Sequence, residues 1–178
     1  MIRSQLLLYL LLFFFQASLF GQERTLQLRL HNAVDIALGQ EDVTLEELSV
    51  NDAAIRKEVP TDLSKDRLYK LRIQSKLKGY AYLGSAPSKE RDFDYVLIFN
   101  PQLTLIKAKV LIYRETFGRA IETPRWLQQF EGMTPTSSPK FGNNIDGISG
   151  ATISARSMTR AVAQALKTID TLHKATLL

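Results

Sequence analysis

The sequence predicts a single α+β domain, in which an antiparallel sheet is followed by a loop of small residues and a long C-terminal helix. Short runs of alternating apolar residues, separated by turn residues, fill the middle of the chain. One apolar stripe at helical spacing runs through its C-terminal part. The 178 residues are enough for one domain with a substantial hydrophobic core.

Four strands are expected in the middle of the chain. Residues 65–74 alternate between apolar and polar, and residues 79–84 form a second β-rich run. Residues 93–99 are apolar at nearly every position, which is typical of a central strand buried on both faces. Asn100-Pro101 is a turn signal, and the alternating residues 103–113 that follow it complete a hairpin.

The C-terminal half carries the helical signals. From residue 154 to 174, apolar residues recur at steps of three and four, which predicts an amphipathic helix. A short helix is expected over residues 124–130, with Thr123 as its N-cap and Pro124 in its first turn. Residues 131–144 are rich in Gly, Pro, Ser, Thr and Asn, so we expect an irregular segment.

Residues 22–77 are expected to form an N-terminal extension with short helices. Within it, the alternation of Leu26, Leu28 and Leu30 predicts a short strand. Residues 44–59 have acidic residues early and spaced apolar residues later, which predicts one or two short helices.

Residues 1–21 have the composition of a secretory signal peptide. Arg3 is followed by an uncharged apolar run over residues 6–15 and then by small residues. The alternative is an N-terminal anchor that stays attached, although the apolar segment is shorter than the ~20 residues that span a bilayer. Both interpretations place the rest of the chain outside the cytoplasm, in the periplasm or on the outer face of the inner membrane.

Composition excludes several kinds of chemistry. The chain has no cysteine, so disulfides, thiolate metal sites and iron–sulfur clusters are excluded. The net charge of +5 is dispersed, which gives no support for a nucleic-acid partner. No nucleophile elbow, phosphate loop or metal-ligand spacing is present, so no catalytic or metal-binding residue is assigned. Whether the chain is an enzyme stays open, and a redox role would need a bound cofactor.

The loop before the last helix has the composition of an anion-binding site. Residues 146–154 contain mainly small side chains, which let a backbone approach a ligand closely. The helix that starts directly behind them supplies free N–H groups and a positive dipole end, which suit a phosphate. Thr152 places a hydroxyl at this junction.

The stretch Asp146-Gly147-Ile148-Ser149-Gly150-Ala151-Thr152 resembles the flavinylation motif of the FMN-binding domain family. This family includes flavin-carrying components of the sodium-pumping NADH:quinone reductase and of the Rnf complex. The resemblance covers residues 78–172, because Gly79-Tyr80, the loop 115–118 and the segment 126–130 also follow the family pattern. The chain departs from it at Phe117, where proline is common, and at Tyr113-Arg114, where histidine often stands.

The resemblance implies that FMN is attached covalently to Thr152 through a phosphoester. A flavin transferase of the ApbE type would attach it, with FAD as the donor and a divalent metal. The implied cofactor-binding residues are Thr152, Asp146, Gly147, Ser149, Gly150, Ala151, Ile153, Ser154, Glu115, Thr116, Gly118 and Trp126. Asp146 serves either recognition by the transferase or a local turn. Trp126 either stacks on the flavin or belongs to the core.

The implied function is that of an exported, membrane-associated flavoprotein. It would relay electrons between a membrane-bound redox partner, a reductase, and an extracytoplasmic acceptor. Two alternatives stay open: a small-ligand or structural module with an unmodified Thr152, and an accessory subunit of a membrane redox complex.

Overall fold

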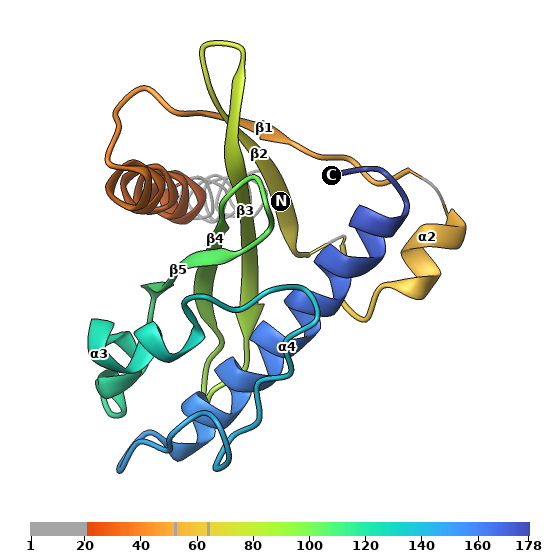
Figure 1. Ribbon diagram of the computed structural model, residues 1–178. Coiled ribbons are helices and arrows are strands. Elements are labelled where there is room, and N and C mark those ends of the chain that lie inside the picture. Colours follow the sequence, from red (N-terminus) through yellow and green to blue (C-terminus); the bar gives the residue numbers. More distant parts are fainter. Residues whose placement is uncertain (1–20, 52, 64) are drawn as a thin grey trace, which may run out of the picture.

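The computed structural model describes residues 21–51, 53–63 and 65–178. Its centre is one sheet of five antiparallel strands, which follow each other in chain order (Figure 1). The strands are β1 (Thr44–Glu47), β2 (Arg67–Ile73), β3 (Lys76–Ala86), β4 (Phe93–Phe99) and β5 (Leu105–Ile112). The predicted α+β class, with an antiparallel sheet and a long C-terminal helix, is confirmed.

The strands β2 to β5 confirm the four strands expected from alternation. β4 pairs with β3 on one side and with β5 on the other, so it is a central strand. Six of its seven residues are buried, which explains the nearly continuous apolar sequence. The turn after Phe99 joins β4 and β5 into the expected hairpin.

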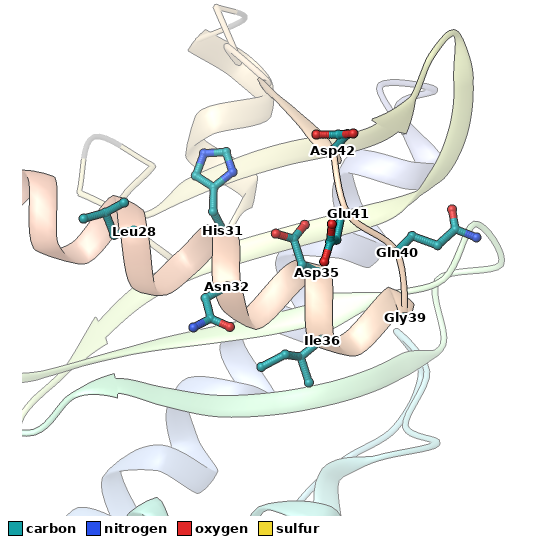
Figure 2. A pocket seen from close by; sticks show the side chains of 9 residues that line it. All are labelled: Leu28, His31, Asn32, Asp35, Ile36, Gly39, Gln40, Glu41 and Asp42. Atoms are coloured by element: carbon teal, nitrogen blue, oxygen red, sulfur yellow. The ribbon is translucent and has the colours of Figure 1, made fainter.

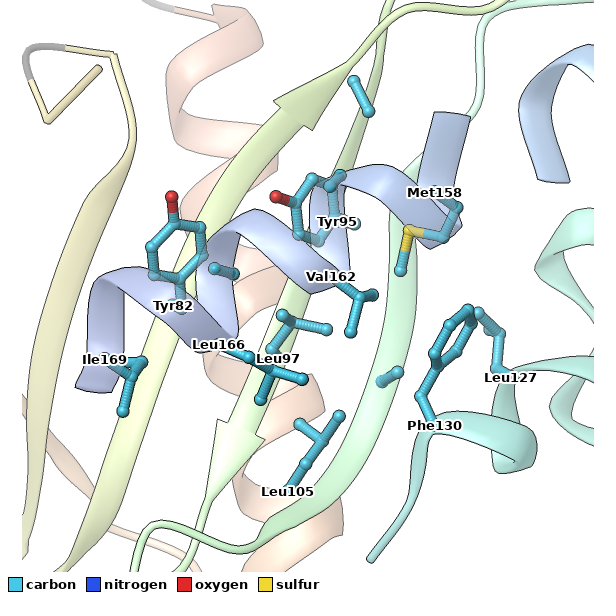
Figure 3. Close-up of a cluster of buried hydrophobic side chains, with 14 of the residues drawn as sticks. Tyr82, Tyr95, Leu97, Leu105, Leu127, Phe130, Met158, Val162, Leu166 and Ile169 are labelled. Carbon is cyan, nitrogen blue, oxygen red and sulfur yellow. The ribbon is translucent and has the colours of Figure 1, made fainter. Parts of the chain in front are cut away.

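The long helix α4 (Thr152–Lys174) packs across one face of the sheet (Figure 1). Figure 3 shows Met158, Val162 and Leu166 facing the sheet, where Tyr82 and Leu97 meet them. All five side chains are fully buried, and each such burial is worth roughly 1.5–3 kcal/mol relative to exposure. The predicted apolar stripe is therefore the contact between α4 and the sheet.

The opposite face of the sheet is covered by a helix over residues 21–38, where a strand was expected (Figure 1). The prediction from Leu26, Leu28 and Leu30 is wrong, because that alternation covers only a few positions. A helical period extends over a longer stretch, with Leu30 and Val34 fully buried against the sheet and Leu28 exposed. The sheet is thus the middle layer of three.

Residues 44–59 contain one strand and one helix. The predicted helical content is right for α2 (Ala53–Glu58) and wrong for β1, which pairs with β2 at the edge of the sheet. β1 is mostly exposed, so its sequence has no apolar alternation to reveal a strand. Its acidic residues resemble a helix start, but Glu46 forms an ion pair with Arg72 of the neighbouring strand at 2.9 Å.

Short helical turns follow β5. They are η1 (Arg119–Glu122), α3 (Pro124–Leu127) and η2 (Gln128–Phe130). Thr123 occupies the predicted N-cap position, but its hydroxyl donates to the carbonyl of Ala120 at 2.7 Å and does not cap the helix. Residues 131–144 contain no helix or strand, as predicted.

The signal peptide or anchor expected in residues 1–21 lies almost wholly outside the described residues. Within the part of the chain that the structure describes, no helix has both the length and the apolar character needed to cross a bilayer.

Candidate functional site

A cavity of about 250 Å³ lies at the start of α4. Three segments enclose it: the loop between β3 and β4, the segment after β5, and the first turn of α4. The lining residues are Ser88, Lys89, Tyr113, Glu115, Phe117, Gly118, Gly150, Ala151, Thr152, Ile153 and Ser154.

The first turn of α4 presents backbone donors to this cavity. Ala151 is the N-cap residue, and no side chain caps the helix. The first N–H groups of a helix have no intrahelical partner and carry the positive end of the dipole, so they favour an anion. Thr152 is exposed, and its hydroxyl makes one long contact of 3.4 Å to the carbonyl of Ile148. Its oxygen is therefore accessible at the cavity.

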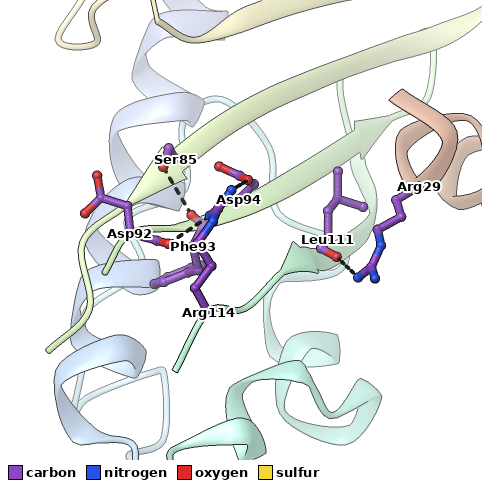
Figure 4. A network of polar contacts seen from close by, with 7 residues as sticks. All are labelled: Arg29, Ser85, Asp92, Phe93, Asp94, Leu111 and Arg114. Carbon is purple, nitrogen blue, oxygen red and sulfur yellow. Dashed lines mark hydrogen bonds and ion pairs between the residues drawn. The ribbon is translucent and has the colours of Figure 1, made fainter. Parts of the chain in front are cut away.

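The segment after β5 is held at its start by a hydrogen bond and an ion pair, and it is tightly packed at its end. The guanidinium of Arg114 donates to the main-chain carbonyl of Asp92 at 2.9 Å and pairs with the carboxylate of Asp94 at 2.5 Å (Figure 4). Gly118 has φ 80°, and a Cβ atom there would lie 2.7 Å from the hydroxyl of Tyr113. Only glycine suits this backbone and this close approach.

Glu115 ties two walls of the cavity together. Its carboxylate accepts the N–H of Glu90 at 2.8 Å and the N–H of Arg91 at 3.3 Å. These backbone donors, above all that of Glu90, lower the pKa of Glu115. The carboxylate therefore holds the loop between β3 and β4 beside the segment after β5.

The motif loop is positioned by the short helical segment of α3 and η2. The indole N–H of Trp126 donates to the carbonyl of Asp146 at 2.8 Å, and the N–H of Asp146 donates to the side chain of Gln129 at 2.8 Å. Trp126 is 6% exposed and packs edge-to-face on Phe130. The tryptophan thus holds the main chain of the loop, while the Asp146 carboxylate stays exposed.

The structure brings together seven of the twelve residues predicted for the site. They are Glu115, Gly118, Gly150, Ala151, Thr152, Ile153 and Ser154. The other five do not line the cavity: Asp146, Gly147, Ser149, Thr116 and Trp126. Four lining residues were not predicted. Tyr113 and Phe117 had a signal, as departures from the family pattern, whereas Ser88 and Lys89 had none in the local sequence.

The lining combines charge, hydrogen-bonding groups and an apolar rim. Lys89 and the first turn of α4 favour an anion, Glu115 contributes an acid, and Ser88, Tyr113 and Ser154 contribute hydroxyls. Phe117 and Ile153 are 82% and 55% exposed, so the rim is apolar and open. Pockets that enclose a drug-sized ligand measure roughly 300–1,000 Å³. This cavity is smaller, so a ligand of that size would keep part of its surface in solvent. These features suit a phosphorylated, partly apolar ligand.

The comparison with known families agrees with this description. Residues 90–167, which contain the hairpin, the helical turns and most of α4, match the model of the FMN-binding domain. Over this part of the chain, the match confirms the resemblance noted in the motif. The match supports a flavin-binding role. No curated protein matches the chain.

The lining residues fit the cofactor that the family implies. FMN carries a phosphate, a chain of hydroxyl-bearing carbons and an apolar ring system. The uncapped start of α4, the buried hydroxyl of Ser154 and the exposed rim side chain of Phe117 offer one suitable surface for each of these parts.

Proposed function

We propose that the chain carries FMN covalently on Thr152 and works outside the cytoplasm as an electron carrier. The observation that carries this proposal is the exposed Thr152 hydroxyl, which lies on the cavity at the last position of the family motif. FMN, when bound, supplies reversible transfer of one or two electrons. The proposed role is that of an electron carrier and not of a self-contained enzyme.

Attachment makes use of the accessible hydroxyl. Thr152 Oγ1 forms the new bond to phosphorus, the pyrophosphate bond of FAD breaks, AMP leaves, and the hydroxyl proton passes to the transferase. The N–H groups of the first turn of α4 and Lys89 then hold the phosphate charge. Phe117 and Ile153, whose side chains are exposed at the rim of the cavity, would border the ring system.

The cellular setting is part of the same proposal. The basic and apolar character of residues 1–21 supports export, either by a cleaved signal or with a retained anchor. An ApbE-type transferase outside the cytoplasm is the proposed partner for attachment. A membrane reductase and an extracytoplasmic acceptor are the proposed partners for electron transfer, whether the chain acts alone or as part of a membrane complex.

The test is the intact mass and visible absorbance of the full chain, expressed in an exporting host with a flavin transferase. The wild type should gain one FMN with loss of water, and Thr152→Ala should gain none. Thr171→Ala is the matched control, since its hydroxyl also donates to the carbonyl four residues earlier in α4. An unmodified wild-type chain, or a flavin that survives denaturation in Thr152→Ala, would contradict the proposal.

A further inference from the structure

One wall of the cavity is a continuous chain of hydrogen bonds. Ser154 is only 2% exposed, and its hydroxyl lies 2.5 Å from that of Ser88 and 2.9 Å from that of Tyr113. The Ser88 hydroxyl also lies beside the carboxylate of Glu115 and helps to lower its pKa. We call these four residues, Tyr113, Ser154, Ser88 and Glu115, the hydroxyl wall. All four line the cavity.

The carboxylate at one end fixes the direction of this chain. A hydroxyl has one proton to donate, and an ionised carboxylate only accepts. The backbone N–H of Glu90 holds the pKa of Glu115 below its usual range, so the carboxylate is ionised at neutral pH. Ser88 therefore donates to Glu115, Ser154 donates to Ser88, and Tyr113 donates to Ser154.

Every proton of the hydroxyl wall is thus used inside the wall. What remains toward the cavity is oxygen lone pairs, which accept hydrogen bonds. The main-chain N–H groups at the start of α4 and the ammonium group of Lys89 have the opposite character, since they only donate. The cavity therefore has a donor side beside Thr152 and an acceptor side beside Ser154, only two residues further along the same helix.

We infer that the hydroxyl wall recognises the ribityl hydroxyls of FMN, and this inference rests on the proposed function. A phosphate has acceptor oxygens and needs the donor side, whereas the hydroxyl-bearing carbons next to it can donate to the acceptor side. Tyr113, Ser154 and Ser88 are then specificity residues for a polyol phosphate. They hold the flavin in the cavity after Thr152 has tethered it.

The test uses the flavin-loaded full chain and a second loaded form, made with an FAD analogue that lacks the ribityl hydroxyls. Intact mass reports attachment, and iodide quenching of flavin fluorescence reports the fraction of attached flavin that has left the cavity. Tyr113→Phe and Ser154→Ala remove wall hydroxyls. Ser157→Ala is the control, because it removes a hydroxyl from the next turn of α4, outside the cavity lining.

With natural FMN attached, each wall variant should move the equilibrium toward free flavin by about two- to tenfold, as for one lost hydrogen bond. Ser157→Ala should match the wild type. The deoxygenated flavin should be equally free in the wild type and in the wall variants, which a purely structural role of the wall would not produce.

Two outcomes would overturn the inference, and intact mass separates them. If the flavin is attached but equally protected in the wild type, Tyr113→Phe and Ser154→Ala, the wall does not recognise it and the proposed function stands. If the wild type carries no flavin, the proposed function fails and the inference fails with it.

Discussion

In the described part of the chain, an open groove and the cavity both lie at helix ends, and the larger of the two is not the proposed flavin site. An open groove of about 980 Å³ lies at the C-terminal end of the helix over residues 21–38, whereas the cavity at the start of α4 measures about 250 Å³. Figure 2 shows the carboxylates of Asp35, Glu41 and Asp42 in the groove. A helix C-terminus and three acids repel a phosphate, whereas the cavity has one acid, Glu115, beside a helix N-terminus and Lys89, which attract it. The groove and the cavity differ in charge and in hydrogen-bond donors. This difference, and not their volume, indicates which of them suits a phosphate.

The acids of the groove do not amount to a metal site. Across residues 21–51, 53–63 and 65–178, no group of three or more His, Cys, Asp or Glu residues could hold a metal ion. The walls of the cavity are also held together by hydrogen bonds. Glu115, Ser154 and Arg114 each form one of these bonds.

The largest expected effect is on the free energy of unfolding. It compares two glycines with positive φ, one in the cavity and one in the groove. Gly118 in the cavity and Gly39 in the groove have φ 80° and 62°, but only at Gly118 would a Cβ meet neighbouring atoms. Gly118→Ala should lower the free energy of unfolding by roughly 2–4 kcal/mol, from backbone strain plus overpacking. Gly39→Ala should lower it by roughly 1–2 kcal/mol, from strain alone. Urea unfolding of the unmodified chain measures both, and equal losses would contradict the tight packing of the cavity.

A second prediction concerns an unsatisfied carboxylate in the groove. Among the described residues, the buried Oδ1 of Asp35 accepts no hydrogen bond, and Asp35 lies near the C-terminal end of its helix. Asp35→Ala should therefore raise the free energy of unfolding by about 1 kcal/mol. Asp170→Ala is the control, since it breaks the ion pair with Lys174 and should bring no gain. A loss of stability in Asp35→Ala would show that the groove carboxylate has a favourable partner.

A third prediction tests the charge of the cavity. Lys89→Glu should slow flavin attachment to Thr152 roughly two- to fivefold, because the phosphate loses a favourable charge. The effect should shrink at high salt. Glu41→Lys, which changes the groove instead, should leave the rate unchanged. The initial rate of flavin incorporation, followed by intact mass at two salt concentrations, measures both variants, and a faster Lys89→Glu would contradict the assignment.

The smallest expected effect is a pH dependence of the free energy of unfolding, caused by Glu115. Its pKa in the folded chain is lowered from 4.5, chiefly by the backbone N–H of Glu90. The ionised carboxylate therefore stabilises the fold above about pH 4.5, and this contribution is lost as the pH falls through the lowered folded pKa. The wild type should exceed Glu115→Gln in stability at neutral pH, and the difference should disappear in acid. A difference that grows on acidification would contradict the ionised state of Glu115.

The elements that pack on one another were predicted from the sequence where their period extended far enough. α4 carries its apolar stripe over many turns, and β4 is apolar at nearly every position, so both were identified correctly. The helix over residues 21–38 was misread because three leucines alternate by chance within a helical period. The edge strand β1 was missed because it buries almost nothing, so no apolar pattern marks it.

The lining of the cavity was predicted from the sequence where it falls within a recognisable motif, as residues 150–154, Glu115 and Gly118 do. Residues 150–154 line the cavity and lie within one motif, so the sequence identified them together. Ser88 reaches Ser154 only because the loop between β3 and β4 lies beside the start of α4. Nothing near residue 88 in the sequence indicates this contact. The register of the sheet, and not any local pattern, brings these residues together.

The position of Thr152 has a consequence for the order of events during biogenesis. Its hydroxyl is at the surface of a helix that is already formed, so a modifying enzyme can reach it without local unfolding. The cavity itself exists only after segments separated by more than sixty residues have met, as the pair of Ser88 and Ser154 shows. If flavin is attached as proposed, the architecture favours folding first and attachment second, because a misfolded chain would offer the acceptor hydroxyl without the cavity around it.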